Sequence, residues 1–227
     1  MIKYDKFWLI PLILIGFMVS CRPTTITAPT PESTHTLPPS ASFPIIDGTI
    51  SDMEWSKAKM YTLQDGSDLY LFQDNGILYL AVIGSRPGTL GANIFLHQNN
   101  QVRVMHISAA LGTAEYNWDG EKWSLIRNFD WQHRTLGNGD LALAEREAYY
   151  KEEGWSAPNA RTGTANNLEM QLKLASGKQR LAVSLIRSSS NIRTVWPADL
   201  GDDTETPFSD GLPINLSVEP DKWYLIP

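Results

Sequence analysis

Aromatic side chains in loop-like segments are the residues of this chain best suited to binding a ligand. A sugar ring presents C–H faces that pack on an aromatic ring, while its hydroxyl groups need fixed polar partners. Binding surfaces are commonly built from loops held by a rigid scaffold, so aromatics in such segments are predicted to line one groove. Ordinary core packing is the alternative at each position. The candidates are Trp131, Tyr149, Tyr150, Trp155 and Trp196.

A second candidate is an acidic run near the C-terminus. Ca²⁺ binds several carboxylate and carbonyl oxygens at once, so such a run could gather its ligands. The candidate ligands are Asp199, Asp202, Asp203 and Asp210. Their spacing does not match a Ca²⁺ loop, and a solvated acidic loop is the favoured interpretation. We therefore predict no cofactor, with Ca²⁺ kept as the alternative.

Histidine and methionine could together ligate a haem iron. Met105 and His106 are neighbours in a predicted strand, so their side chains point to opposite faces and cannot share one iron. His97 with Met105 stays open as a pair. The sequence has no C-x-x-C-H attachment motif, and lone histidines and methionines usually pack in the core or face solvent.

Catalytic motifs are missing from the sequence, which has neither G-x-S-x-G nor H-E-x-x-H. A glycosidase needs two carboxyl groups about 5 to 9 Å apart across a cleft. The glutamates at 145, 147, 152 and 153 instead decorate one predicted, largely solvated helix. No catalytic activity is expected.

Period-two alternation predicts the scaffold that must position these residues. Residues 168–174 alternate apolar and polar side chains, which is typical of a strand with one face in a core and Glu169 and its polar neighbours facing water. Residues 77–83 are apolar on both faces, as expected of a central strand. Turn residues such as Asn75-Gly76, Asn99-Asn100 and Asp119-Gly120 separate the runs. The sequence predicts an all-β, jelly-roll-like antiparallel sandwich.

One helix, near residues 140–153, interrupts the strands. Asp140 can cap its start and Gly154 can end it. Its narrow apolar stripe is Leu141, Ala144 and Ala148. We expect this helix to lie across an edge or an open end of the sandwich.

The N-terminal segment predicts that the protein is exported from the cytoplasm. Lys3 and Lys6 precede an apolar run too short to cross a bilayer, and Met18-Val19-Ser20-Cys21 looks like a lipobox. Residues 1–20 are then a lipoprotein signal peptide and Cys21, the only cysteine, carries the lipid anchor. Residues 21–44, rich in Ser, Thr and Pro, form a tether. An uncleaved anchor helix is the alternative.

Length and charge restrict the remaining chain, residues 45–227, to one domain without a basic patch. The net charge is −6, so nucleic acid is not expected as a partner.

Residues 46–55 read I-D-G-T-I-S-D-M-E-W, and the L-Y-L runs at 69–71 and 78–80 follow. With the strands at 168–174 and 181–186 and the Trp196-Pro197 segment, they resemble the family 9 carbohydrate-binding-module and DOMON-like domains. The resemblance implies a β-sandwich in which Asp47, Gly48 and Trp55 shape the first turn and fill the core. Members of the group bind sugars, haem or other small ligands.

Three functional hypotheses follow. The first is a non-catalytic carbohydrate-binding module, held by its lipid anchor on the extracytoplasmic face of a cell membrane, whose partner is a carbohydrate or related cell-surface polymer. The second is a structural or protein-interaction module of the cell envelope without a sugar site. The third is a haem-binding DOMON-type domain.

Overall fold

The computed structural model describes residues 43–51, 53–88, 90–108, 111–129, 140–158, 166–187, 193–197 and 215–227, with the backbone alone at 140–143. These ranges belong to one compact unit, residues 39–227. Several predicted functional residues lie outside the described residues: Cys21, Trp131, Asp199, Asp202, Asp203 and Asp210.

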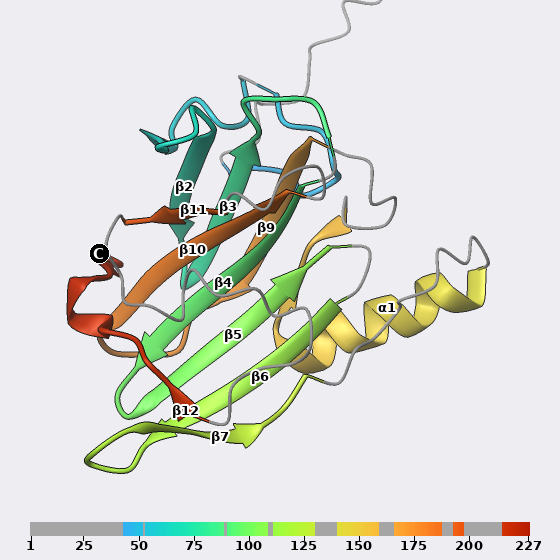
Figure 1. Cartoon of the computed structure of the whole chain (residues 1–227). Helices are drawn as coiled ribbons and strands as arrows, with labels where there is room; N and C mark the ends of the chain where they lie inside the picture. The colour runs from blue at the N-terminus through green and yellow to red at the C-terminus, as the bar shows by residue number, and fades with distance from the viewer. Residues whose placement is uncertain are drawn as a thin grey trace, which may run out of the picture. The chain divides into compact units, whose positions relative to one another are not determined.

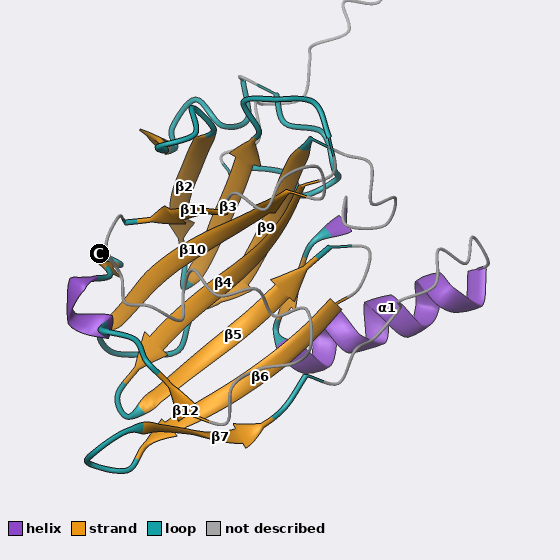
Figure 2. Cartoon of the chain, in the orientation of Figure 1, coloured by secondary structure: helices purple, strands orange, loops and turns teal. Residues whose placement is uncertain are grey.

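Two antiparallel sheets and one helix make up the described domain (Figures 1 and 2). Sheet A has the order β1 (Lys59–Thr62), β2 (Asp68–Asp74), β3 (Ile77–Ile83), β9 (Asn167–Lys173), β8 (Trp155–Ser156). Sheet B has the order β11 (Arg193–Trp196), β10 (Gln179–Arg187), β4 (Leu90–Gln98), β5 (Gln101–Ile107), β6 (Leu111–Trp118), β7 (Trp123–Arg127), β12 (Asn215–Leu216), and β13 (Tyr224–Leu225) also pairs with β10. Helix α1 spans Asp140–Glu153. The predicted all-β sandwich with one inserted helix is confirmed.

The predicted turns between neighbouring strands are present, and their residues adopt the positive φ angles that tight turns need. Asn75 and Gly76 between β2 and β3 have φ values of 48° and 75°. Positive φ at both central residues is the property of a type I′ turn, whose twist matches that of the flanking strands. Asn99 between β4 and β5 has a φ of 52°. These local signals therefore specify the β2–β3 and β4–β5 hairpins.

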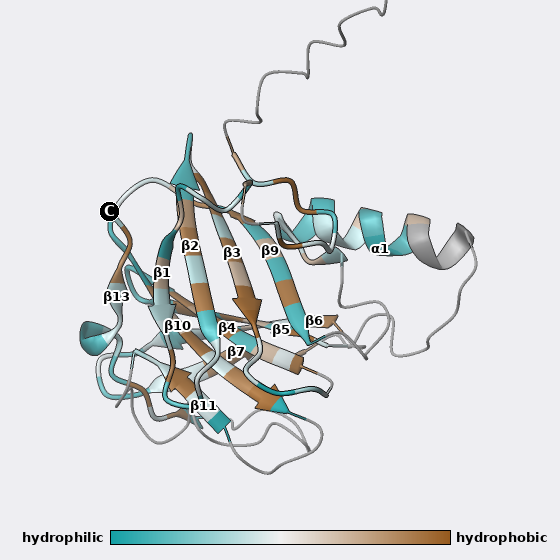
Figure 3. Cartoon of the chain, turned by 90° about the horizontal axis from the view of Figure 1, so that it is seen from above, coloured by the Kyte–Doolittle hydropathy of each residue, from teal (hydrophilic) through white to brown (hydrophobic). Residues whose placement is uncertain are grey.

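The main core lies between the sheets. Leu168, Met170 and Leu172 of β9 face it, each about 1 % exposed. Figure 3 shows the alternation of apolar and polar residues along β9. Strand β3 is buried at Leu78 to Val82, so its prediction as a central strand is confirmed.

A second core covers the outer face of sheet B. Phe95, Val102 and Val104 on this face pack with Leu216 and Trp223 of the C-terminal segment. In Figure 1 this red segment lies beside the sheet. Burial on both faces explains why β4 is apolar along most of its length.

The outer face of sheet A is covered by the N-terminal segment, which corrects the prediction that Glu169 faces water. Glu169 is fully buried and accepts hydrogen bonds from the Gly48 N–H (2.6 Å) and the Trp55 indole N–H (3.2 Å). Burial raises the pKa of the Glu169 carboxyl, and Asp47 and Glu54 add to this, while the two hydrogen bonds oppose it. One residue of the I-D-G sequence, Gly48, and one of the E-W pair, Trp55, are thus both hydrogen-bonded to the Glu169 carboxylate, and Trp55 is only 3 % exposed.

Helix α1 has the predicted bounds but not the predicted buried stripe. Ala144 and Ala148 are exposed, and the side chain of Leu141 lies outside the described residues. Among the side chains that the structure describes on α1, the buried ones are Arg146, Tyr149 and Glu153. Tyr149 and Glu153 can be buried here because they hydrogen-bond to side chains of sheet B, and Arg146 donates to the Tyr150 hydroxyl of the same helix (2.8 Å). The predicted stop is confirmed: Gly154 has a φ of 69°, and its N–H donates to the Tyr150 carbonyl (2.9 Å).

Glu153, predicted as a solvated helix residue, joins α1 to sheet B. Its carboxylate accepts hydrogen bonds from Arg103 of β5 (2.6 Å) and from both terminal nitrogens of Arg127 of β7. Burial alone would raise the pKa of Glu153, but the hydrogen bonds from Arg127, Arg103 and Thr113 lower it below the ordinary value. Glu153 is therefore a charged anchor for the end of the helix.

Candidate functional site

A hollow of about 540 Å³ opens where two hairpin turns of sheet B meet the C-terminal segment. The β4–β5 turn contributes Asn99 and Asn100, and the β6–β7 hairpin contributes Trp118 and Trp123. The backbone N–H of Trp118 donates to the Asn100 carbonyl (2.9 Å), so the two hairpins are held side by side. We call this hollow the Trp118 pocket; its remaining lining residues are His97 and Val218 to Lys222.

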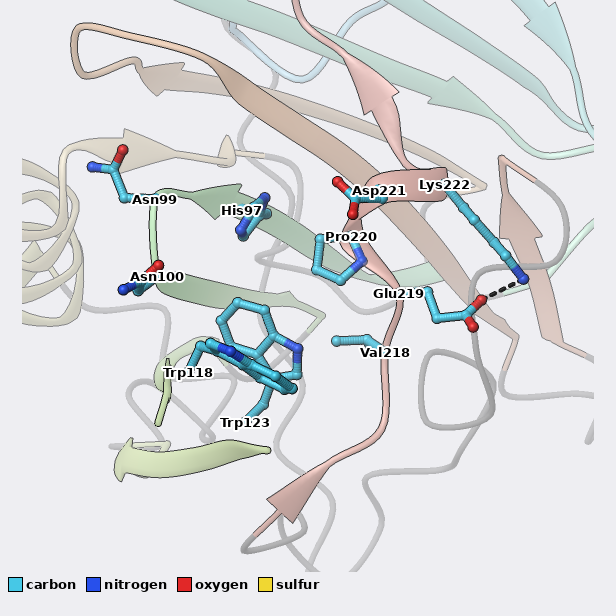
Figure 4. A pocket seen from close by; sticks show the side chains of 10 residues that line it. All are labelled: His97, Asn99, Asn100, Trp118, Trp123, Val218, Glu219, Pro220, Asp221 and Lys222. Atoms are coloured by element: carbon cyan, nitrogen blue, oxygen red, sulfur yellow. Dashed lines mark ion pairs between the residues drawn. The ribbon is translucent and has the colours of Figure 1, made fainter. Parts of the chain in front are cut away.

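Two indoles of unequal exposure form one wall of the Trp118 pocket. Trp118 and Trp123 lie opposite each other in the β6–β7 register, with ring centroids 5.3 Å apart and planes at 52° (Figure 4). Trp123 is 7 % exposed and also contacts the His97 ring edge-on at 5.5 Å. Trp118 is 38 % exposed. The packed indole therefore supports the one that is open to solvent.

The turn that carries the two indoles is braced by Asp119. Its carboxylate accepts hydrogen bonds from the backbone N–H groups of Glu121 and Lys122, both 2.9 Å. The hydrogen bonds to Lys122 and Glu121 lower the pKa of Asp119, which keeps the carboxyl ionised as an acceptor. Asp119 therefore stabilises the backbone of the turn next to Trp118.

The opposite wall is the short 3₁₀ helix Pro220–Lys222 with the residues before it. Arg180 of β10 donates to the Asp221 carbonyl (2.8 Å) and the Trp223 carbonyl (3.1 Å), which holds this wall against the sheet. The Lys222 ammonium pairs with the Glu219 carboxylate. The Asp221 side chain is 99 % exposed, and its carboxylate lies 3.9 Å from the Arg180 guanidinium.

His97 is an uncharged polar group in this pocket at neutral pH. Burial lowers its pKa below the ordinary imidazole value and Arg180 acts in the same direction, while a backbone hydrogen bond with Asn99 and the charge of Asp221 oppose the shift. A neutral imidazole has one donor and one acceptor nitrogen. The pocket thus combines an exposed indole, which offers an apolar face, with amide, imidazole and carboxylate groups, which can form hydrogen bonds.

Three of the aromatics predicted from the sequence lie together at the end of α1, and two of them, Tyr150 and Trp155, line a hollow of about 460 Å³. The Trp155 ring is 5.9 Å from Tyr149 and 5.3 Å from Tyr150. Trp155 is 2 % exposed and Tyr149 7 %, and the Trp155 indole N–H and the Tyr149 hydroxyl both bond Thr113. Pairing of β8 with β9 turns Trp155 into the main core, so these rings act mainly as core side chains.

Trp196 belongs to a different aromatic cluster. Its ring lies 4.7 Å from Tyr61 and 5.1 Å from Tyr224. Strand β11, which carries it, is at the other edge of sheet B from the strands that α1 contacts (Figure 1). The one common groove expected from the sequence is therefore not formed by the four described aromatics.

The pairing of His97 with Met105, left open by the sequence, does not fit the sheet. Met105 lies opposite Ile94 and faces the main core, whereas His97 contacts Trp123 and Trp223 on the other face. Side chains on opposite faces cannot ligate one iron. Among the described residues, no three His, Cys, Asp or Glu side chains gather as a metal site would require.

Trp118 lies in a strand-like run of the sequence, which predicts core packing rather than contact with a ligand. One signal could have found it: Trp118 and Trp123 flank the same Asp119-Gly120 turn, which places both rings on one face at the tip of a hairpin. Strand ends next to turns expose side chains that mid-strand positions bury.

Comparisons of the chain with protein-family models, with curated proteins and with solved structures gave no match. The part of the chain that the structure describes contains no helix with the length and hydropathy of a membrane span.

Proposed function

We propose that this protein is a non-catalytic carbohydrate-binding module, anchored by a lipid on Cys21 to the extracytoplasmic face of a cell membrane. Its ligand is a carbohydrate or a related cell-surface polymer. The binding site is the Trp118 pocket, and Trp118 stacks on the sugar ring.

The observation that carries the proposal is the exposed indole of Trp118 above a polar hollow. Sugars bind where an aromatic face meets hydrogen-bonding groups on a rigid frame. Trp123 and Asp119 supply the frame, and Asn99, Asn100 and Asp221 supply exposed polar groups. The resemblance of residues 46–55 to the family 9 carbohydrate-binding-module and DOMON-like domains, some members of which bind sugars, supports the same class of ligand.

Trp118→Ala is expected to weaken binding to a neutral polysaccharide by about 1 to 3 kcal/mol, because one desolvated aromatic contact is lost. The melting temperature should change little, since Trp118 is 38 % exposed. A glycan array first selects the polysaccharide, and titration calorimetry then compares the native protein with the variant.

Trp118→Tyr is the matched variant, because it keeps an aromatic face and should retain most of the affinity. Unchanged affinity in Trp118→Ala would remove this pocket as the sugar site. No retention on any glycan would favour the protein-interaction hypothesis, and a Soret band in the purified protein would favour the haem-binding one.

Cys21→Ser is expected to release the protein from the membrane fraction, because a serine cannot carry the thioether-linked lipid. Fractionation and metabolic labelling with a fatty-acid analogue measure this. A Cys21→Ser protein that still takes up the label contradicts the anchor at this residue.

A further inference from the structure

Two further hollows adjoin the β2–β3 turn at one end of sheet A. The first, of about 460 Å³, lies between this turn, the end of α1 and strands β8 and β9. The second, of about 520 Å³, lies between the turn, the start of β1 and the C-terminal residues. Asn75 lines both hollows, so they meet at the tip of the hairpin.

Both hollows carry positive charge. Lys151 and Lys173 line the first, and Lys57 and Lys59 line the second. All four lysines are exposed, and none forms an ion pair with another described residue. Neither lining includes an Asp or Glu side chain. In a chain of net charge −6, this end of sheet A is a locally basic surface.

The carboxylates next to these residues in the sequence lie outside both linings. Asp74 precedes Asn75 and accepts a hydrogen bond from its side-chain amide (2.8 Å), and Glu152 follows Lys151, but neither lines a hollow. The Trp118 pocket differs, because its lining holds Glu219 and Asp221 against Lys222 alone. The two surfaces therefore suit ligands of different charge.

The other lining groups include hydroxyl, amide and aromatic side chains, which are the kinds that contact sugars. In the first hollow, Ser156 pairs with Gln171 across β8 and β9, and Lys173 pairs with Ile77 across β9 and β3. Tyr150 contributes a half-buried ring beside them. In the second hollow, Gln73 and Tyr224 lie with the lysines, and the Lys59 ammonium is 5.7 Å from the centre of the Tyr224 ring.

The spacing of the lysines requires a ligand longer than one sugar. Strands β1 and β9 are separated by two others, a distance of about 14 Å across the sheet. The register places Lys59 level with Met170, three residues or about 10 Å along β9 from Lys173 and on the opposite face, so a ligand that reaches both must pass over the tip of the β2–β3 hairpin. A single anionic group cannot reach both pairs. A polymer with repeated carboxylates can place one in each hollow and gain from binding both.

We propose that this end of sheet A is a second binding surface, for an acidic polysaccharide that runs across the β2–β3 turn and bears carboxylates in contact with the two lysine pairs. The surface is independent of the Trp118 pocket and goes beyond the function proposed for it.

Titration calorimetry at low salt with oligogalacturonates of two and six residues tests the proposal. The hexamer should bind at least about tenfold more tightly than the dimer, because only the hexamer spans both hollows. Lys151→Ala/Lys173→Ala and Lys57→Ala/Lys59→Ala should each weaken hexamer binding by about fivefold or more, and added salt should weaken it further. Uncharged cellohexaose should not bind here.

Lys122→Ala/Lys178→Ala is the matched control, because it removes two exposed lysines that line neither hollow. It should leave hexamer binding unchanged, as should Trp118→Ala, which separates this proposal from the sugar site above. No binding of the hexamer, equal binding of the dimer, or an equal loss in the control would overturn the proposal. Tighter binding of a single-stranded DNA oligomer than of the uronate would also overturn it, in favour of nucleic acid.

Discussion

Glu153→Ala is expected to lower the free energy of unfolding by about 3 to 5 kcal/mol, the cost of removing one partner from a buried ion pair. The Glu153 side chain is 4 % exposed, and its carboxylate faces Arg103 and Arg127. Without it, Arg103 loses the carboxylate with which it pairs, and Arg127 keeps its longer ion pair with Glu115 (3.7 Å). Urea denaturation followed by tryptophan fluorescence measures the loss.

Glu152→Ala is the matched control. Glu152 precedes Glu153 on the same helix and its side chain is exposed, so its substitution should change the free energy of unfolding by less than about 0.5 kcal/mol. Arg103 also donates to the Glu153 carbonyl (2.6 Å), so one backbone contact survives in Glu153→Ala. Equal effects of the two substitutions would contradict the anchoring role of Glu153.

The pH dependence of this effect has a definite sign. Because the pKa of Glu153 in the folded protein lies below its ordinary value of 4.5, its ionised form stabilises the folded state. That contribution is complete above the unfolded-state pKa and is lost as the pH falls through the folded-state pKa. The difference in stability between native protein and Glu153→Ala should therefore shrink in acid.

Local signals in the sequence predicted most of the fold. Asn75-Gly76 requires positive φ at adjacent residues, which few other dipeptides allow, and the structure has that turn. Gly154 ends α1 for the same reason. Alternation in β9 predicted its core-facing residues, because the pleat itself sets a period of two.

Long-range contacts were beyond such reasoning. Glu169 reads as a solvent-facing residue of β9, yet residues more than a hundred positions earlier in the chain cover it. Arg103, Arg127 and Glu153 come from three separate elements, and no spacing in the sequence brings them together. Burial of a charged group depends on its partners, which only the fold supplies.

The candidate site was difficult to predict for a related reason. Trp118 and Trp155 are both tryptophans at the ends of strands, but one is 38 % exposed and the other 2 %. Trp155 pairs with β9 and is covered by Tyr149 and Tyr150, whereas Trp118 ends β6 next to the β6–β7 turn, where Trp123 packs against its ring. Side-chain type alone could not separate these two environments.

Trp55→Ala is the second substitution with a large expected effect, a loss of about 3 to 5 kcal/mol in the free energy of unfolding. Trp55 is 3 % exposed and packs edge-on against Tyr70 at 6.3 Å. Its removal leaves a cavity on the outer face of sheet A and takes one hydrogen-bond donor from Glu169. Thermal and urea denaturation measure the change.

Two further variants separate packing from hydrogen bonding in this effect. Trp55→Phe keeps a ring but has no donor for Glu169. It should therefore destabilise the protein less than Trp55→Ala does, and the difference between the two variants measures the packing that the phenylalanine ring retains. Trp118→Ala removes the same type of side chain from an open position and should leave the melting temperature nearly unchanged. If Trp55→Ala is no more destabilising than Trp118→Ala, the N-terminal segment does not hold sheet A as its contacts indicate, and the significance given to the I-D-G and E-W residues is lost with it.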